Sequence, residues 1–208
     1  MVPAARAAPT TEAISKHAPS LPPNVHLLTT FGERPDWSPD GQRLAFMDKT
    51  YGDCFEFNLL TREMTVINSL PSNPGFMRVR YLANGDFILI GARTFKDFDT
   101  IRNEDQELWV LKYGEEEPVP LDHKVSEGVA VSRNSQRIAW ANNDQQYPDR
   151  FDEGESAIYV ADIDYSSGEP VLINQEEIIR GRLPDCQLAP QLLNYYNLII
   201  LIKFIRLL

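Results

Sequence analysis

Two stretches of this chain are alike: residues 37–46 read Trp-Ser-Pro-Asp-Gly-Gln-Arg-Leu-Ala-Phe, and residues 131–140 read Val-Ser-Arg-Asn-Ser-Gln-Arg-Ile-Ala-Trp. They share serine, glutamine, arginine and alanine at the same steps, and their apolar positions agree in type. Between them, residues 81–90 read Tyr-Leu-Ala-Asn-Gly-Asp-Phe-Ile-Leu-Ile, with the same order of apolar run, turn and apolar run. Self-similarity at a spacing of about fifty residues indicates an internal repeat.

A second motif recurs in step with the first. It consists of Phe55-Glu-Phe57, Leu108-Trp-Val110 and Ile158-Tyr-Val160, each followed by a polar turn and another apolar run. Each unit is therefore predicted to contain four short strands, named A to D from the inside of the unit outward. The units span about residues 34–68, 77–122 and 127–174, and their last apolar runs are Met64–Ile67, Val119–Leu121 and Val171–Ile173.

The predicted turns have suitable chemistry. Pro39-Asp40-Gly41 fits a tight turn because proline presets φ and glycine tolerates positive φ. Asn84-Gly85 is a strong signal for a two-residue hairpin, and Asn134-Ser135 is a weaker version of it. The repeated region shows no sustained period of 3.6 residues, so helix is expected to be scarce.

Four strands in about 40–50 residues are typical of one blade of a β-propeller. A propeller closes with about four to eight blades, so three units predict an all-β, partial propeller, open or truncated, of about three four-stranded blades. Residues 25–30 are expected to form an outer strand that precedes the first unit. Because an unfinished propeller leaves one blade face open, self-association through that face is an alternative.

The first unit resembles a known repeat. Residues 34–46 look like the TolB-type (PD40, WD40-like) β-propeller repeat, whose core is Pro-x-Trp-Ser-Pro-Asp-Gly followed by an apolar strand. The third unit has Arg133 and Ser135 where the family has proline and glycine, and the second unit matches least. The matching residues are Pro35, Trp37, Ser38, Pro39, Asp40 and Gly41 in the first unit, Asn84 and Gly85 in the second, and Ser132 and Asn134 in the third.

The resemblance covers roughly residues 25–175 and implies a TolB-like propeller that binds a protein or a small ligand. Many similar proteins are exported, so it favours a secreted or extracytoplasmic location, while the compartment stays open. Related blades form the gating domain of prolyl-oligopeptidase-like serine hydrolases. We therefore expect a non-catalytic binding module that is a fragment of a longer TolB-like protein. The alternative is the propeller domain of such a hydrolase, with the catalytic domain absent from this chain.

The ends of the chain differ from the repeats. Residues 1–23 are rich in alanine and proline and predict a flexible arm without the apolar core of a complete signal peptide. Residues 176–191 are expected to start a further blade or to be a linker. Residues 192–208 form a hydrophobic tail that contains Lys203 and Arg206, and a tail anchor, a core helix or strand, and a non-native tail are all open. A membrane is not expected as a partner unless this tail is native.

Charge and cysteine content exclude several classes of protein. The chain has 30 acidic and 20 basic residues, a net charge of −10, which argues against nucleic acid as a partner. Cys54 and Cys186 are too few for a disulfide scaffold, and two idle thiols or one bridge both stay open. With two cysteines and three histidines, a structural zinc site lacks ligands, so no zinc centre is predicted.

The B–C connections of the second and third units, residues 92–106 and 142–156, are long and acidic, whereas that of the first unit, about residues 49–53, is short. All B–C loops of a propeller emerge on one face, and insertions on one face often mark the binding face. We predict an acidic rim that binds a partner or holds a hard cation such as Ca²⁺, with solvated loops as the alternative. The candidate binding residues are Asp97, Asp99, Glu104, Asp105, Asp149, Asp152 and Glu153.

Aromatic residues occur in the same loops and on the strands. Those of the loops either anchor a partner or tuck onto neighbouring blades. Those of the strands are expected to pack between blades. The loop aromatics are Phe95, Phe98, Tyr147 and Phe151, and the strand tryptophans are Trp37, Trp109 and Trp140.

The sequence contains no Gly-x-Ser-x-Gly, His-Glu-x-x-His or P-loop motif. His123 is the one histidine of the repeated region, and no motif points to a serine that it would activate. No catalytic residue and no cofactor other than Ca²⁺ is therefore predicted. A hydrolase or lyase that uses carboxylates and a bound cation stays an alternative, as does a truncated product without activity.

Overall fold

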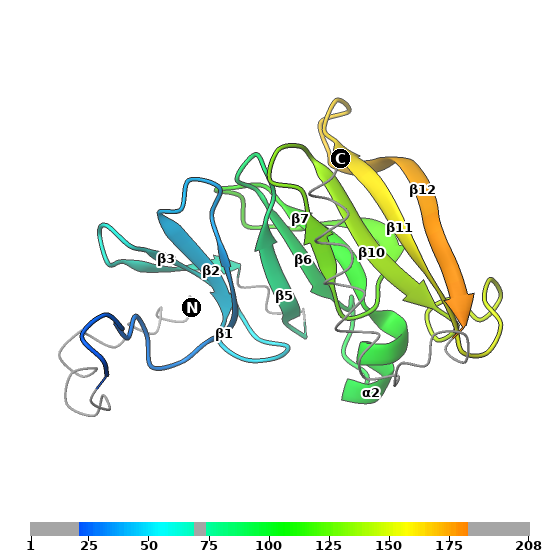
Figure 1. Cartoon of the computed structure of the whole chain (residues 1–208), viewed down its shortest axis with the longest axis horizontal. Coiled ribbons are helices and arrows are strands. Elements are labelled where there is room, and N and C mark those ends of the chain that lie inside the picture. The colour runs from blue at the N-terminus through cyan, green and yellow to red at the C-terminus, as the bar shows by residue number, and fades with distance from the viewer. Residues whose placement is uncertain (1–20, 69–73, 183–208) are drawn as a thin grey trace, which may run out of the picture.

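The computed structural model describes residues 21–68 and 74–182. Over these residues the chain is almost entirely β-structure, arranged as three four-stranded antiparallel sheets that lie side by side in chain order (Figure 1). In each sheet the strands follow one another from one edge to the other in the order of the sequence. The predicted partial propeller of three four-stranded blades is confirmed, and within the described residues the sheets do not close into a ring.

The strands occur in the predicted A-to-D order in every blade. The first blade contains β1 (Glu33–Trp37), β2 (Arg43–Met47), β3 (Cys54–Asn58) and β4 (Met64–Asn68). The second contains β5 (Phe76–Tyr81), β6 (Phe87–Gly91), β7 (Glu107–Leu111) and β8 (Val119–Lys124). The third contains β9 (Val129–Val131), β10 (Arg137–Asn143), β11 (Glu155–Asp164) and β12 (Val171–Arg182).

The A–B turn of the first blade shows why the repeat motif has its residues. The Asp40 carboxylate accepts hydrogen bonds from the Ser38 hydroxyl at 2.6 Å and from the Gln42 amide at 3.0 Å. The Ser38 hydroxyl in turn accepts from the Arg43 amide at 2.9 Å, and Gly41 takes a φ of 69°. These hydrogen bonds lower the pKa of Asp40, that from Ser38 most. The motif therefore closes the hairpin through its own side chains.

Two hydrophobic interfaces hold the blades together, and β6 contributes to both. All five residues of β6 are buried, as expected of a strand covered on both faces. Phe87 and Leu89 face the first blade, and Ile88 and Ile90 face the third. We call the cluster between the first and second blades the first interface: Ala45, Met47, Cys54, Phe76, Val79, Tyr81, Phe87, Leu89, Trp109 and Leu111.

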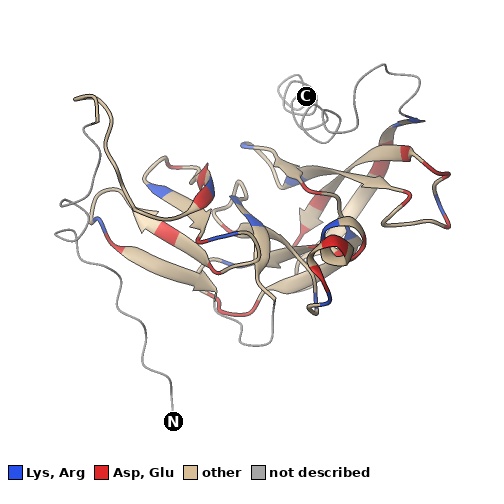
Figure 2. Ribbon diagram, turned by 90° about the horizontal axis from the view of Figure 1, so that it is seen from below, with Lys and Arg blue, Asp and Glu red and all other residues tan. Residues whose placement is uncertain are grey.

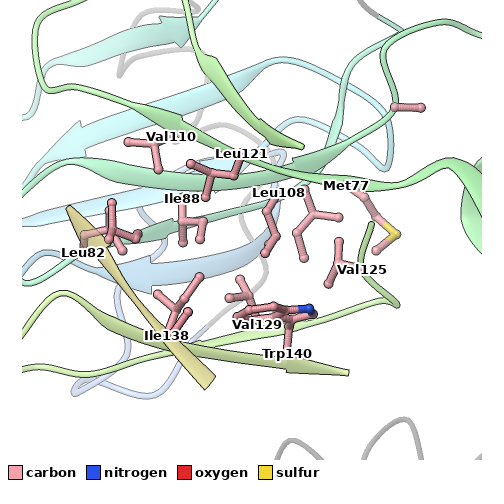
Figure 3. Close-up of a cluster of buried hydrophobic side chains, with 14 of the residues drawn as sticks. Met77, Leu82, Ile88, Leu108, Val110, Leu121, Val125, Val129, Ile138 and Trp140 are labelled. Carbon is pink, nitrogen blue, oxygen red and sulfur yellow. The ribbon is translucent and has the colours of Figure 1, made fainter. Parts of the chain in front are cut away.

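The second interface lies between the second and third blades (Figure 3). It is mostly aliphatic, and Trp140 is its largest side chain. The predicted packing of Trp109 and Trp140 between blades agrees with their burial. The members of the second interface include Met77, Leu82, Ile88, Ile90, Ile101, Leu108, Val110, Leu121, Val125, Val129, Ile138, Trp140, Ala161 and Ile163.

The prediction that Trp37 packs between blades is wrong, because its side chain is 51% exposed. Trp37 pairs with Leu44 across β1 and β2, and directly opposed residues lie on the same face of a sheet. The neighbouring residue Ala45 faces the second blade, so Leu44 and Trp37 face the other way. No described blade covers that side of the first sheet.

Two segments depart from their predicted structure. Residues 25–30 form no strand, and the structure describes no preceding blade whose strand C they could pair with as an outer strand. Instead Phe31, just after them, contacts Phe46 and Phe55 with ring centroids 6.0 and 5.5 Å apart. Residues 176–182 continue β12 along β11 through two register shifts, so they belong to the third blade rather than to a further blade or linker.

Several predictions concern the cysteines and the chain ends. Cys54 is a fully buried free thiol in the first interface, and burial raises its pKa far above the usual range. Cys186, residues 1–20 and the remainder of the 176–191 segment lie outside the described residues, as does the 192–208 tail. Within the described ranges no helix is long and apolar enough to cross a membrane.

Candidate functional site

The long B–C loop of the second blade folds into a short helix at one end of the strands (Figure 1). Here α2 (Phe98–Thr100) runs into a turn of π-helix, η1 (Ile101–Asp105). The Asp97 carboxylate caps α2 by accepting from the Thr100 amide at 2.9 Å and the Thr100 hydroxyl at 2.8 Å. Ile101 is fully buried in the second interface, so an apolar anchor and a polar cap position the loop.

The B–C loop of the third blade lies against this helical loop. The buried Gln146 side chain donates to the Asn103 carbonyl of η1 and accepts from the Asn143 amide at 3.0 Å. Lys124, at the end of β8, donates its amide to the Tyr147 hydroxyl at 3.0 Å. The hydrogen bond from Gln146 to Asn103 thus joins the two long loops, and we call the surface that they share the loop face.

Some of the predicted acidic site residues form hydrogen bonds or ion pairs within this chain. Asp97 is the cap of α2, and hydrogen bonds from the Thr100 amide and hydroxyl lower its pKa. Asp105 pairs with Lys96 at 2.6 Å, and Asp152 pairs with Arg182. Acidic and basic residues are accordingly interspersed on this surface rather than separated (Figure 2).

The other predicted acids stay open to solvent. Within residues 21–68 and 74–182, Asp99, Glu104, Asp149 and Glu153 are exposed and form no ion pair. The structure therefore brings together the second-blade acids on one helical turn and the third-blade acids on a neighbouring loop. It does not gather them into one cluster: no group of three or more acidic, histidine or cysteine residues in the described chain could hold a metal ion. Binding of a hard cation such as Ca²⁺ by the acidic loops stays a prediction.

The loop face contains two adjoining hollows, which we call the loop-face groove. They have volumes of about 340 and 260 Å³ and share Asp99 and Arg102. The larger hollow is also lined by Arg34, Thr50, Tyr51, Met77 and Phe98, and the smaller by Asn103, Ser126, Glu127, Asn143, Gln145 and Gln146. The groove thus has an aromatic end at the first blade and a polar end at the third.

The four loop aromatics divide into two kinds. Phe95 and Phe98 are 56% and 61% exposed; they meet edge to face at 5.5 Å, and Phe98 stacks on Tyr51 at 5.6 Å. Phe151 is buried beneath Arg180, whose guanidinium carbon lies 4.4 Å from the ring centroid. Tyr147 is half-buried, and its hydroxyl accepts a hydrogen bond from the Lys124 amide. Only the second-blade pair is exposed enough to contact a partner.

Asp36 joins all three blades at their inner strands. It lies on β1 and is 7% exposed. Its carboxylate accepts from the Tyr81 amide of the second blade at 2.9 Å and from Arg80 at 3.4 Å. Arg133, in the A–B turn of the third blade, donates to the same carboxylate at 3.1 Å and to the Trp37 carbonyl at 2.9 Å. We call this arrangement the Asp36 clip.

Sequence reasoning missed the Asp36 clip, although a signal was present. Arg133 stands where the TolB-type repeat has proline, and its long charged side chain reaches from the third blade to Asp36 of the first. Tyr51 and Arg102 were also missed, because neither residue belongs to a motif. His123 lies away from the groove, with its ring nitrogens 2.9 Å from the Leu121 carbonyl and 2.8 Å from Gln175.

Comparison with known proteins bears on the fold. No family model and no curated protein matches the sequence. Among solved structures, a protein assigned as TolB from Agrobacterium tumefaciens superposes with a TM-score of 0.52 at 13% identity, over 74% of this chain and 52% of that one. This chain thus spans about half the length of that protein.

Two further solved structures match with lower TM-scores. TolB from Acinetobacter baumannii has a TM-score of 0.43 at 19% identity, over 62% of this chain and 29% of that one. Pyrococcus horikoshii acylaminoacyl peptidase has a TM-score of 0.44 at 17% identity, over 71% of this chain and 25% of that one. With its three four-stranded sheets and its match to the Agrobacterium structure, the chain has the fold of a TolB-like β-propeller.

Proposed function

We propose that this chain is a non-catalytic propeller module that binds an exposed segment of another protein in the loop-face groove. The observation that carries the proposal is exposed Phe98, which lines the groove together with Arg102 and meets the exposed ring of Phe95 edge to face. Aromatic residues and arginine are the side chains that most often dominate the free energy of protein–protein binding. Phe98 is the first residue of the capped α2 and its ring stacks on Tyr51, so little conformational entropy is lost when it is covered.

The acids of the loop face add a charge preference to this proposal. Asp99 lines both hollows of the groove, and Asp149 lies on the adjoining loop of the third blade. Arg102 is paired with Glu127 and so does not offset these carboxylates. A segment that combines apolar and basic side chains matches this surface.

We further propose that the chain is part of a longer propeller. Three blades leave the outer faces of the first and third sheets without a described neighbour, and the chain spans 52% of the Agrobacterium protein. Sequencing of the full transcript tests this point, because further four-strand repeats in the same reading frame would supply the missing neighbours.

The groove is tested with a random peptide library displayed on phage and selected on the full chain. We expect the recovered peptides to carry apolar and basic residues. Phe98→Ala should weaken their binding about thirtyfold or more, because an aromatic anchor contributes about 2 kcal/mol or more.

Leu60→Ala is the matched control. It removes a 76% exposed apolar side chain from the β3–β4 turn, at the opposite end of the strands from the B–C loops. Peptides that bind Phe98→Ala as tightly as the parent chain, or that lose affinity equally in Leu60→Ala, would show that the groove is not the binding site.

The charge preference is tested separately with Asp99→Asn and Asp149→Asn combined. These two acids are suited to the test because neither caps a helix nor forms an ion pair in the described chain. We expect the affinity for the selected basic peptides to fall several-fold, with a weaker dependence on salt. Glu115→Gln with Glu116→Gln, in the β7–β8 turn, is the control and should leave the affinity unchanged.

A further inference from the structure

The outer strand of the third blade is longer and more exposed than the outer strands of the other two blades. β12 has 12 residues, whereas β4 has 5 and β8 has 6. It is the last strand at one edge of its sheet, and no described strand pairs with its other side (Figure 1). Every residue from 173 to 182 is exposed. At ~3.3 Å per residue, β12 presents a free edge about 40 Å long.

An edge of this length is unusual in a propeller. A free edge offers its N–H and C=O groups to another strand, and propellers generally leave only short, protected edges. β12 contains no proline that would block pairing. It has two register shifts along β11, and Ile178 is the extra residue between the Ile158–Ile179 and Tyr159–Glu177 pairs. A bulge increases the twist of a strand, but the pairing of β12 with β11 continues beyond both shifts to Arg182.

Two isoleucines lie next to each other on the exposed part of this strand. The side chains of Ile178 and Ile179 are 42% and 60% exposed. Isoleucine favours strands and is among the residues most often buried in folded proteins. An adjacent exposed pair on a free edge therefore offers an apolar contact to a strand that pairs there.

The charges on either side of the isoleucines favour one kind of partner. Residues 176–182 read Glu-Glu-Ile-Ile-Arg-Gly-Arg, so acids precede the isoleucines and bases follow them. When two copies of this strand run antiparallel, with Ile178 opposite Ile179 of the second copy, Glu177 of each copy lies opposite Arg180 of the other. An in-register parallel arrangement would instead place Glu177 opposite Glu177. Opposite charges stabilise a pair of strands and like charges destabilise it, so the strand is complementary to itself when reversed.

The ion pairs that these residues form within one chain are compatible with this arrangement. Glu177 pairs with Arg180 at 2.7 Å, and Arg180 also pairs with Glu155 at 3.1 Å. The side chains of Glu177 and Arg180 stay 36% and 33% exposed. Two such pairs brought together by antiparallel strands form a cluster in which acids and bases alternate, so no ion pair within the chain has to break.

From this edge we infer that β12 pairs antiparallel with β12 of a second copy of the chain, through residues 176–182 and about a two-fold axis. A two-fold dimer uses the same surface on both copies, which a self-complementary strand supplies. Backbone hydrogen bonds would then join the two third blades into one continuous sheet. Because one short segment of each copy forms the contact, we expect a weak dimer whose formation depends on concentration.

The inference does not depend on the proposed function. No residue of β12 lines the loop-face groove. β12 is also the outermost strand of its blade whether or not further blades exist. Loss of peptide binding in the groove and loss of the dimer are therefore independent results.

The test is sedimentation velocity of the full chain at rising concentrations, up to about 1 mM. We expect the parent chain to shift from monomer to dimer. Ile178→Lys combined with Ile179→Lys should raise the dissociation constant about tenfold or more, because the introduced lysines of the two copies face one another. Val66→Lys is the matched control: Val66 is 51% exposed on β4, the outer strand of the first blade, and its substitution should leave the dimer unchanged.

A second variant separates strand pairing from a general loss of association or folding. Ile178→Glu combined with Ile179→Glu should also be monomeric, because like charges again face one another. An equimolar mixture of the lysine and glutamate variants should form a heterodimer, since opposite charges then face one another across the strands. A parent chain that stays monomeric, a dimer that persists in the lysine variant, equal loss in Val66→Lys, or a mixture that stays monomeric would each overturn the inference.

Discussion

The two interfaces of the second blade are built differently, although one strand serves both. The first interface contains four large aromatic side chains, Phe76, Tyr81, Phe87 and Trp109. It also contains buried Glu56, which accepts from the Tyr81 hydroxyl at 2.5 Å and from the Tyr113 hydroxyl at 3.1 Å. A buried polar network of this kind selects one packing arrangement, because any other leaves its members unpaired.

The second interface is mostly aliphatic and gains a contribution from outside the sheets. Ile101 of the helical loop packs into it beside the strand residues. Shape and volume do most to specify this interface, whose buried Gln106 amide group donates to the Tyr51 hydroxyl at 3.1 Å, whereas a buried carboxylate with two phenol donors helps to specify the first. The loop face is therefore attached to the sheets through the second interface, by way of Ile101. The Asp36 clip lies at the inner edge of the sheets and connects all three blades.

Removing the clip should have the largest effect on stability. Asp36→Ala leaves Arg80, Arg133 and the Tyr81 amide without their shared acceptor, and we expect a loss of about 3–5 kcal/mol, typical of breaking a buried charge pair. Urea unfolding followed by circular dichroism measures it. A loss below about 1 kcal/mol would mean that the clip is no more than a surface ion pair.

The two interfaces can be compared directly through adjacent residues of β6. Ile88 faces the second interface and Leu89 the first, and both are fully buried. Ile88→Ala and Leu89→Ala should each cost about 2–5 kcal/mol in the free energy of unfolding, the range for large-to-small core substitutions. If the three blades unfold as one unit, both variants show a single transition, and separate transitions in either one would show that the interfaces act independently.

Tyr81→Phe removes one hydrogen bond from the polar network of the first interface and leaves the aromatic ring in place. We expect a loss of about 1–2 kcal/mol, because Glu56 loses one hydrogen-bond donor but keeps Tyr113. The same urea experiment measures it. An unchanged unfolding midpoint would show that the Tyr81 hydroxyl does not help to specify the packing.

This network also predicts a dependence on alkaline pH. Burial and the hydrogen bond to Glu56 raise the pKa of Tyr81 in the folded chain. The neutral phenol is thus favoured in the folded state, so its contribution is complete below the unfolded pKa of about 10 and declines as the pH rises above it. Stability should fall more steeply above pH ~10 in the parent chain than in Tyr81→Phe. Identical slopes would contradict this assignment.

The smallest expected effect concerns the loop that the second interface anchors. Asp97→Ala removes the cap of α2 and should cost about 0.5–1 kcal/mol, the lower part of the range for helix caps. Faster hydrogen exchange at the Thr100 and Ile101 amides, with the strands unaffected, is the expected result. Faster exchange throughout the second blade would mean instead that the loop supports the interface.

Much of the fold was predictable because the repeat is local. Strand, turn and strand follow one another within a few residues, so motifs such as Ser38 to Gly41 contain the hydrogen-bonding groups that close their own hairpins. The number of strands in each blade and the position of the long loops follow from the same pattern. The alternation of buried residues along β5 is also visible in the sequence.

The candidate sites were predictable only in part, because their residues come from different blades. Sequence reasoning placed acids and aromatics in the B–C loops, yet only the folded chain shows that Asp97 and Asp152 are engaged while Phe98 is exposed. Local sequence patterns define the blades, since each blade closes through residues that are near one another in the chain. Tertiary structure decided which charges meet, as at Asp36 and Arg133, because those contacts depend on how whole blades pack and not on any local pattern.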